Sequence, residues 1–280
     1  MTQKTEIEIR GLYKAFGEQT VLAGIDLDIH QGDVLAIVGG SGCGKTVLMN
    51  HILSQLIPDR GTIRVVDHDQ PGDPLCDLTE VGEFELDNIH KHWGVVFQRN
   101  ALFSGTVYDN IALWLREVKG MKEDEIEDIA RRSLKAVALP SSAEFLSQPQ
   151  ERLSGGMAKR LAVARALAMD PLVIFYDEPT TGLDPTSSAQ IHDLIYKTHH
   201  ALDRRTTLII THDKDLLSRL RPRTIMLSEG RVFFDGTFED FEASVSPIVR
   251  PYFEEMPALQ SRPMENFTQI PSERRKGLLI

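Results

Sequence analysis

The stretch VLAIVGGSGCGKT, residues 34–46, decides the fold. Its first five residues are apolar and predict a buried strand, and from Lys45 the apolar spacing becomes that of a helix. A glycine-rich loop between a strand and a helix is typical of a phosphate-binding loop, because its backbone N–H groups can converge on an anion. We expect Lys45 to reach the β- and γ-phosphate oxygens and the Thr46 hydroxyl to reach Mg²⁺. The residues predicted to bind the nucleotide in this loop are Gly39, Gly40, Ser41, Gly42, Cys43, Gly44, Lys45 and Thr46.

A second apolar run, LVIFYDEP at 172–179, ends in two carboxylates. It predicts another buried strand with Asp177 and Glu178 at its carboxyl end, where ligands of open α/β sheets bind. We expect Asp177 to hold Mg²⁺, directly or through water. Glu178 is predicted to act as the general base, or at least to orient the attacking water.

Two polar residues follow other predicted strands. Gln98 comes directly after WGVVF and His212 after TTLIIT. We predict that both are catalytic: Gln98 through Mg²⁺ or water, and His212 through a hydrogen bond to the γ-phosphate.

A third pattern, RLSGGMAKRLAVARA at 152–166, places two glycines at the mouth of a predicted helix. Glycine is a poor helix former, so its presence there needs another reason. A helix start without side chains leaves free N–H groups and the positive end of the helix dipole exposed, which suits an anion. The residues alone leave open which anion this helix start meets.

The composition limits the function further. The formal charge of −10 argues against nucleic-acid binding, which needs clustered Lys and Arg. Cys43 and Cys76 have no metal-binding spacing. The N-terminus lacks the apolar core of a signal peptide. No apolar run approaches the roughly 18 residues of a membrane helix, so we expect any membrane role to come from a partner.

Strand-like and helix-like segments alternate along the chain, which predicts an α/β fold with a parallel sheet. Residues 61–66 and 93–97 read as a strand pair, residues 45–56 as one helix, and TIMLSEGRVFFDG as a hairpin around Glu229 and Gly230. A helical insert is expected over about 106–166, within a strand-rich core over 1–105 and 167–256. The tail from 257 to 280 has little periodicity and is a candidate partner-binding segment, with disorder as the alternative.

These residues together resemble the ATP-binding cassette (ABC) subunits of membrane transporters. The resemblance covers about residues 6–245 and rests on six motifs in the family's order: the loop 39–46, Gln98, LSGGM at 153–157, Asp177 with Glu178, GLDP at 182–185, and His212. It implies an ABC ATPase domain over 1–256: a RecA-like P-loop NTPase cassette with an antiparallel β subdomain and an α-helical subdomain.

The resemblance also implies a homodimer of cassettes bound head to tail. Ser154, Gly155 and Gly156 of one chain would then contact the γ-phosphate held by the other, and Asp184 would lie across the dimer seam. ATP and Mg²⁺ are the implied cofactors. Phe16 resembles the aromatic residue that stacks on adenine, with Tyr13 as the competing candidate. The LSGGM motif has Met157 where the family usually has Gln.

Within the family, LSGGM, residues 97–117 and SPIVRPYF at 246–253 resemble the MlaF branch, which serves MCE-type phospholipid transporters. That branch usually has Asn-Pro where this chain has Ser246 and Pro247, and its bacterial members often read GQDP where this chain reads GLDP. The implied partners are an MlaE-like permease, an MCE protein and a small STAS-domain protein. The permease would dock near 98–103, and the cassette would lie on the cytoplasmic face of the inner membrane, with glycerophospholipid as indirect cargo.

Other functions are open on the residues alone. An ABC ATPase could serve another transport substrate, or a soluble cassette could act on ribosomes or DNA, although such proteins usually carry two cassettes or a coiled coil. A scaffold that binds ATP without hydrolysis would not need Glu178 and His212. A kinase would need an acceptor site and has no use for Ser154.

Overall fold

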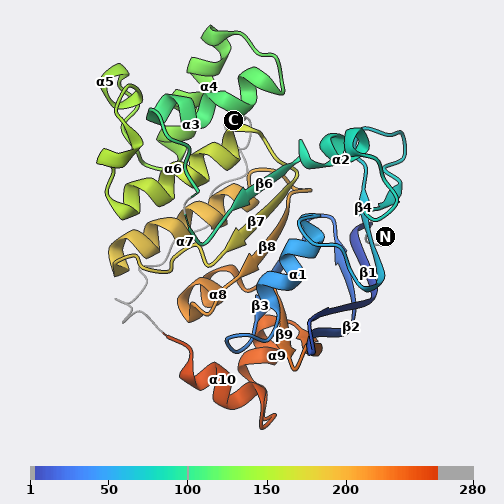
Figure 1. Ribbon diagram of the computed structural model, residues 1–280. Helices are drawn as coiled ribbons and strands as arrows, with labels where there is room; N and C mark the ends of the chain where they lie inside the picture. The colour runs from blue at the N-terminus through green and yellow to red at the C-terminus, as the bar shows by residue number, and fades with distance from the viewer. Residues whose placement is uncertain (1–3, 100, 258–280) are drawn as a thin grey trace.

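The computed structural model describes residues 4–99 and 101–257, and a six-stranded sheet forms its centre (Figure 1). The strand order is β10 (Arg231–Gly236), β9 (Arg223–Ser228), β3 (Val34–Val38), β8 (Thr206–Ile210), β7 (Val173–Asp177) and β6 (Trp93–Val96). Strands β9, β3, β8, β7 and β6 are parallel, and β10 pairs antiparallel with β9 as the predicted hairpin. Because parallel strands end at the same edge, the loops after β3, β6, β7 and β8 come together there.

A second, four-stranded sheet packs beside the first. Its strands are antiparallel, in the order β2 (Gln19–His30), β1 (Thr5–Phe16), β4 (Arg60–Val66) and β5 (Leu75–Asp77). The prediction that residues 61–66 pair with 93–97 is therefore wrong. Both segments are strands, but β4 pairs with β1 and β5, whereas β6 pairs with β7. The short strand β5 and helix α2 (Glu83–His90) separate them in the chain.

Helix α1 (Lys45–Ile52) lies between the two sheets and joins their cores. Its buried residues Leu48, Met49 and Ile52 pack in one cluster with apolar residues of β1, β2, β3 and β8. The helix is four residues shorter than the apolar pattern predicts. Ser54 adopts a left-handed conformation with φ of 58°, which helical backbone cannot accommodate. The phosphate loop is thus held between two packed sheets.

A helical lobe lies at the β6 edge of the sheet (Figure 1). It contains α3 (Val107–Glu117), α4 (Glu123–Ala136), α5 (Ala143–Leu146), a 3₁₀ turn (Gln150–Arg152) and α6 (Gly155–Ala168). Thr106 begins α3 with a capping box, since its hydroxyl accepts from the N–H of Asp109 while the Asp109 carboxylate accepts from Thr106. The lobe has its own apolar core, which continues onto β6, β7 and β8.

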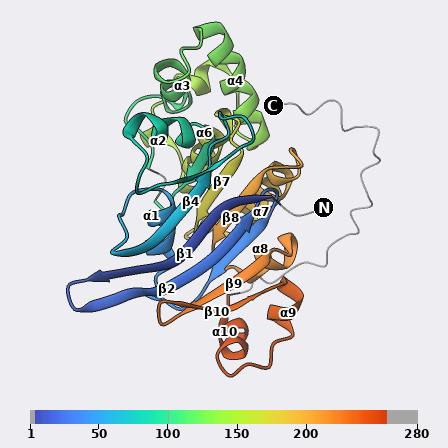
Figure 2. The same ribbon diagram turned by 90° about the vertical axis from the view of Figure 1, so that its right-hand side faces the viewer.

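The remaining helices are α7 (Pro185–His199), α8 (Lys214–Leu220), α9 (Phe238–Glu242) and α10 (Val249–Glu255). Figure 2 shows α3, α4 and α6 of the helical lobe at the opposite end of the molecule from α9 and α10. A third apolar cluster joins α9 and α10 to β3, β9 and α8. Nearly all of the predicted tail, from residue 258 onward, lies outside the described residues. Among the residues that are described, none of the helices has the length and apolar content needed to cross a membrane. The predicted α/β fold, with an antiparallel sheet and a helical lobe beside the parallel sheet, is confirmed.

Candidate active site

The phosphate loop follows β3 directly and is shaped by glycines in conformations that other residues avoid. Gly39 has φ of 143°, and a Cβ there would lie 2.4 Å from the carbonyl oxygen of Leu227. Gly44 caps α1 with φ of 103°, and its Cβ would lie 2.8 Å from a methyl group of Leu22. No acidic residue occupies the first turn of α1. The start of this helix is therefore available to an anion.

Lys45 is folded back onto its own loop. Its Nζ donates to the carbonyl oxygens of Gly39 at 2.7 Å and Gly40 at 3.0 Å. The sequence analysis missed a further contact: the Tyr252 hydroxyl of α10 donates to the Gly39 carbonyl at 3.2 Å and accepts from the Gly39 N–H at 3.0 Å. Burial raises the pKa of Tyr252, so the hydroxyl keeps its proton at neutral pH. Tyr252 thus fixes the first peptide of the phosphate loop.

The predicted carboxylates lie at the end of β7. Asp177 is 7% exposed and Glu178 is 9% exposed. Burial, followed by the neighbouring Glu178 charge, raises the pKa of Asp177, and Lys159 and Lys45 oppose that rise. Glu178 has a left-handed backbone with φ of 47°, and its N–H donates to the carbonyl of Ile210 on β8 at 2.9 Å. A strained conformation held by a neighbouring strand is common at functional sites.

The structure brings His212 and Glu178 into contact. The Nδ1 atom of His212 lies 2.8 Å from the Glu178 carboxylate. Since an ionised carboxylate only accepts, the imidazole Nδ1 carries the proton in this pair. The His212 side chain is 49% exposed, so its other edge faces outward. These two side chains come from the neighbouring strands β7 and β8, as the sequence predicts from their positions at strand ends.

A buried network behind this pair was not predicted. The Asp213 carboxylate accepts from the Thr180 hydroxyl at 2.8 Å and lies 2.7 Å from Nε2 of His192 on α7. Burial alone would raise the pKa of Asp213, but the His192 hydrogen bond and charge outweigh it, and the pKa is lowered. The network ties the loop after Glu178 to the loop after His212, and so holds the two side chains together.

Gln98 is exposed and follows β6. Its backbone carbonyl and that of Phe97 each accept a hydrogen bond from Nζ of Lys159 on α6, at 3.0 Å. Lys159 is 2% exposed, and burial lowers its pKa to about 8, although the Asp177 and Glu178 charges oppose the change. The sequence analysis did not identify Lys159, because a lysine in a helical pattern normally faces solvent.

The predicted second anion site lies at the start of α6. Ser154 caps the helix, and its hydroxyl accepts from the N–H of Met157 at 3.3 Å. Ser154 and Gly155 are exposed, and no acidic residue occupies the first turn. The start of α7 lies beside it, since a Cβ on Gly156 would lie 3.2 Å from the hydroxyl oxygen of Ser187. In α7 the exposed Asp184 accepts from the N–H groups of Thr186 and Ser187, both at 3.0 Å.

The two adenine candidates differ in their surroundings. The hydroxyl of Tyr13 pairs with that of Thr20 at 2.8 Å, and Arg60 lies over its ring. The Phe16 ring is 48% exposed, and the Lys14 ammonium lies over it, 5.6 Å from the centroid. Phe16 is therefore exposed enough to stack on a ligand.

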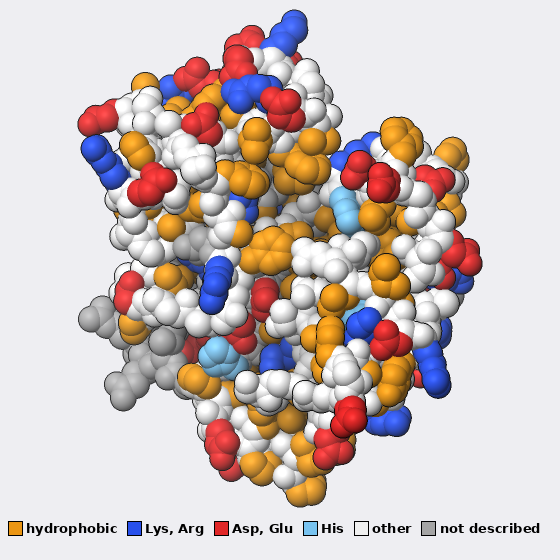
Figure 3. All heavy atoms as spheres, viewed as in Figure 1, with side chains coloured by type: hydrophobic (Ala, Val, Ile, Leu, Met, Phe, Trp, Pro, Cys, Tyr) orange, Lys and Arg blue, Asp and Glu red, His pale blue; other side chains and the backbone are white. Residues whose placement is uncertain are grey.

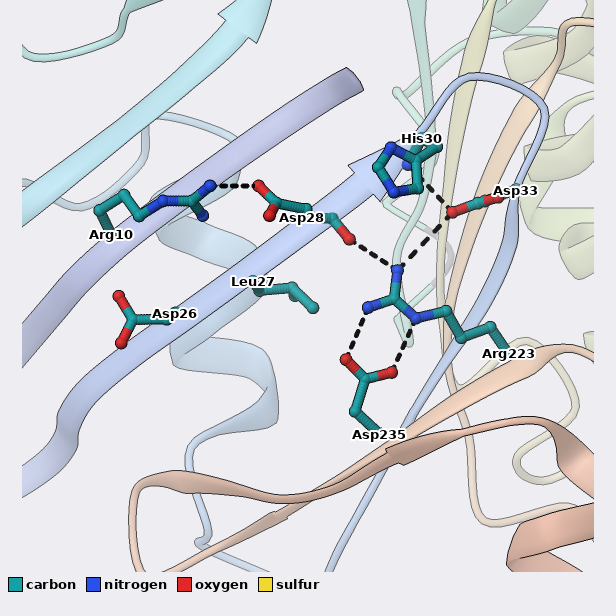
Figure 4. Close-up of a pocket in the computed structure, with 8 residues that line it drawn as sticks. All are labelled: Arg10, Asp26, Leu27, Asp28, His30, Asp33, Arg223 and Asp235. Atoms are coloured by element: carbon teal, nitrogen blue, oxygen red, sulfur yellow. Dashed lines mark hydrogen bonds and ion pairs between the residues drawn. The ribbon is translucent and has the colours of Figure 1, made fainter. Parts of the chain in front are cut away.

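A cavity of about 630 Å³ lies elsewhere (Figure 4). It contains Asp28 of β2, Asp33 before β3, and Arg223 and Asp235 of the β9–β10 hairpin. Arg223 is held by both oxygens of Asp235, by the Asp28 carbonyl and by Asp33. These residues lie where β3 begins, opposite the phosphate loop. The two arginines of the cavity, Arg10 and Arg223, are already paired with the lining carboxylates of Asp28 and Asp235, so the loop edge of the sheet is the better candidate.

Comparisons with known proteins agree with this geometry. Residues 22–181 match the family model described as ABC transporter. The chain is 36% identical to the intermembrane phospholipid transport system ATP-binding protein MlaF of Haemophilus influenzae, over 83% of this chain and 84% of MlaF. It is 33% identical to the chloroplastic protein TRIGALACTOSYLDIACYLGLYCEROL 3 of Arabidopsis thaliana, over 88% and 72% of the two chains. It is 39% identical to the L-cystine transport system ATP-binding protein TcyN of Escherichia coli, over 82% and 89%.

A solved structure agrees as well. The dimeric, post-hydrolysis state of the ATP-binding cassette MJ0796 with ADP and Pi superposes with a TM-score of 0.71 at 27% identity, and the match covers 83% of this chain and 98% of MJ0796. The family model covers more than half of the chain, and the ABC cassette fold predicted from the sequence is confirmed. The chain belongs to the ABC transporter family, as an ATP-binding subunit that hydrolyses ATP to drive transport.

Proposed function

We propose that this chain works as a homodimer that energises phospholipid transport between or across bacterial envelope membranes. Its membrane partner would be an MlaE-like permease, joined by an MCE protein and a STAS-domain protein. The cassette would bind peripherally at the cytoplasmic face of the inner membrane. The observation that carries this proposal is the similarity to MlaF over 83% of the chain, together with the LSGGM motif.

Within each cassette, ATP would be held by the phosphate loop, residues 39–46. Lys45 would exchange its two carbonyl partners for the β- and γ-phosphate oxygens. Phe16 would stack on adenine, which its half-exposed ring favours over the hydrogen-bonded Tyr13. Glu178 would accept a proton from the attacking water, and His212 would exchange its 2.8 Å hydrogen bond to Glu178 for one donated to a γ-phosphate oxygen.

The residues at the loop edge also fit Mg²⁺. Thr46, Gln98 and Asp177 offer hydroxyl, amide and carboxylate oxygens, the ligands that this hard cation prefers. A cation would favour the ionised form of Asp177, whose buried carboxylate has a raised pKa. When bound, Mg²⁺ would neutralise charge on the phosphate oxygens.

The second half of each site would come from the other chain. Ser154, Gly155 and Gly156 would donate to the γ-phosphate that the partner's loop holds, and Asp184 would lie at the seam. The dimeric MJ0796 cassette bound to ADP and Pi supports this arrangement. ATP-driven closure followed by hydrolysis and reopening would then move the permease.

The permease would dock where the helical lobe meets the sheet. Apolar side chains gather in the hollow there (Figure 3). Phe103, between β6 and α3, is 50% exposed, and Leu102 is packed against the core of the lobe. The Arg165 guanidinium lies 5.0 Å from the Phe103 ring centroid and supports it from α6.

A second candidate function is transport of another substrate, such as an amino acid, and the 39% identity to TcyN favours it. The experiment that separates the two is purification of the native membrane complex, with identification of its chains and bound small molecules by mass spectrometry. Phospholipid, an MlaE-like permease and an MCE protein would support our proposal. An amino-acid permease without phospholipid would contradict it.

A further inference from the structure

Lys159 occupies an unusual position for a lysine. It lies on α6, five residues after Ser154 caps that helix, yet it is buried and reaches out of the helical lobe. Its ammonium donates to the carbonyls of Phe97 and Gln98, on the loop after β6. A buried charge is costly unless it is hydrogen-bonded or paired, and hydrogen bonds from a charged donor are about twice as strong as neutral ones. The contact therefore holds the loop firmly to the helix.

A second contact, between Gly94 of β6 and the backbone of α6, packs the helix and the strand together as one rigid unit. Gly94 lies in the middle of β6, and a Cβ there would lie 3.2 Å from the carbonyl oxygen of Ala166 on α6. The helix backbone thus packs closely on the strand. A displacement of α6 must therefore be passed to β6 and to the loop that follows, because close-packed elements have little room to deform.

The two ends of this unit face different nucleotides in the proposed dimer. Ser154 and the glycines at the start of α6 would contact ATP held by the partner, whereas Gln98 would contact Mg·ATP held by the chain's own phosphate loop. We propose that Lys159 is a positioning residue that links the two half-sites of one chain, so that engagement of α6 by the partner's ATP places Gln98 over the chain's own nucleotide.

This link rests on the roles proposed for Ser154 and Gln98. Asp177 and Glu178 are the acidic groups that act on Lys159 from the end of β7, and they favour its charged form. The Lys159 ammonium contacts the backbone carbonyl of Gln98, and Lys159 is not among the residues proposed to contact ATP itself. Its loss should therefore lower the rate of hydrolysis more than the binding of ATP.

The test is steady-state phosphate release by the complex that the full-length chain forms in its host membrane. We expect Lys159→Met to lower kcat at least tenfold with KM for ATP within threefold of wild type. Lys159→Arg, which keeps the charge and the donors, should restore at least a third of kcat. Lys159→Gln keeps hydrogen-bond donors without the charge, and its kcat should lie between those of Lys159→Met and Lys159→Arg. It replaces Lys159→Met in the test if that variant folds poorly.

Lys119→Met is the matched control. Lys119 also donates to a backbone carbonyl at the other end of α6, that of Met169 at 2.7 Å, but it does not contact the Gln98 loop. The kcat of Lys119→Met should stay within twofold of the wild-type value. Wild-type kcat in folded Lys159→Met, or Lys159→Arg as impaired as Lys159→Met, would overturn the link. If the wild-type complex releases no phosphate, the roles proposed for Ser154 and Gln98 in hydrolysis are themselves wrong.

Discussion

The two proposed anion sites of this chain are built differently. The phosphate loop lies between two sheets, and Lys45 is already bonded to two of its carbonyls while Tyr252 holds Gly39. The start of α6 lies on the helical lobe, with Ser154 and Gly155 exposed. The phosphate loop is exposed at Gly40, Ser41, Gly42 and Thr46, so this first site, called the enclosed site below, is enclosed only at its base, where it is internally bonded. The start of α6, called the exposed site below, has its first residues exposed.

The difference indicates that the two sites have different roles. An enclosed loop can bind a nucleotide by itself, because its backbone is already shaped for phosphate. An exposed helix start with two glycines adds to catalysis only when another surface brings an anion to it. Four substitutions distinguish the two sites by their effects on kcat and on the KM for ATP, and they are given in order of decreasing expected effect.

Glu178→Gln removes the proposed base from the enclosed site. We expect kcat to fall by about 10²–10³-fold, in the range for loss of general base catalysis, while ATP binding is retained. The ATP-bound protein should accumulate as a closed dimer, which size-exclusion chromatography detects. Glu83→Gln, at the exposed start of α2, is the control and should turn over normally. Near-normal turnover of Glu178→Gln would rule out the assigned base.

Ser154→Arg fills the exposed site and leaves the phosphate loop intact. We expect kcat to fall about 10²-fold, comparable with loss of a donor to a developing oxyanion, while equilibrium binding of a fluorescent ATP analogue changes little. Ser147→Arg, an exposed position elsewhere on the lobe, should behave as wild type. Equal loss of binding and turnover in Ser154→Arg would mean that the exposed site is no separate half-site.

Tyr252→Phe loosens the enclosed site slightly. The hydroxyl makes two hydrogen bonds to Gly39, and a net loss of about 1 kcal/mol corresponds to about a fivefold rise in KM for ATP. The rate kcat should change less than twofold. Tyr108→Phe, which loses a hydroxyl bond to Glu123 far from the phosphate loop, is the control. An unchanged KM would show that α10 does not tune the loop.

Met157→Gln introduces the residue that is usual in the family at the exposed site. Met157 is partly buried against the core of the helical lobe, and its N–H already serves the Ser154 cap. We expect kcat and KM both to stay within about twofold, as for most substitutions outside a packed core. A tenfold gain in kcat would show that Met157 limits the exposed site.

The sequence predicts the enclosed site well for a physical reason. Its strands are unbroken apolar runs, and the polar residues that follow them must meet at one edge of a parallel sheet, so Lys45, Asp177, Glu178 and His212 could be grouped by their positions alone. Local patterns of this kind carry their own structural meaning.

Contacts between distant segments were not predictable in this way. Tyr252 lies 213 residues from Gly39, and no periodicity joins them. Lys159 looks like a surface lysine until the loop after β6 is placed beside it. The pairing of β4 failed for the same reason, because strand order depends on packing between sheets rather than on the strands' own residues.

The central claim is that one complete ATPase site needs both halves, from two chains. Its most direct test mixes Lys45→Ala protein, whose phosphate loop is broken, with Ser154→Arg protein, whose helix start is blocked. Hybrid dimers isolated through two affinity tags contain one intact site and one doubly broken site. We expect each parent to release phosphate at no more than about a hundredth of the wild-type rate, and the hybrids to regain phosphate release. Inactive hybrids, alongside a wild-type chain that turns over as a monomer, would contradict it.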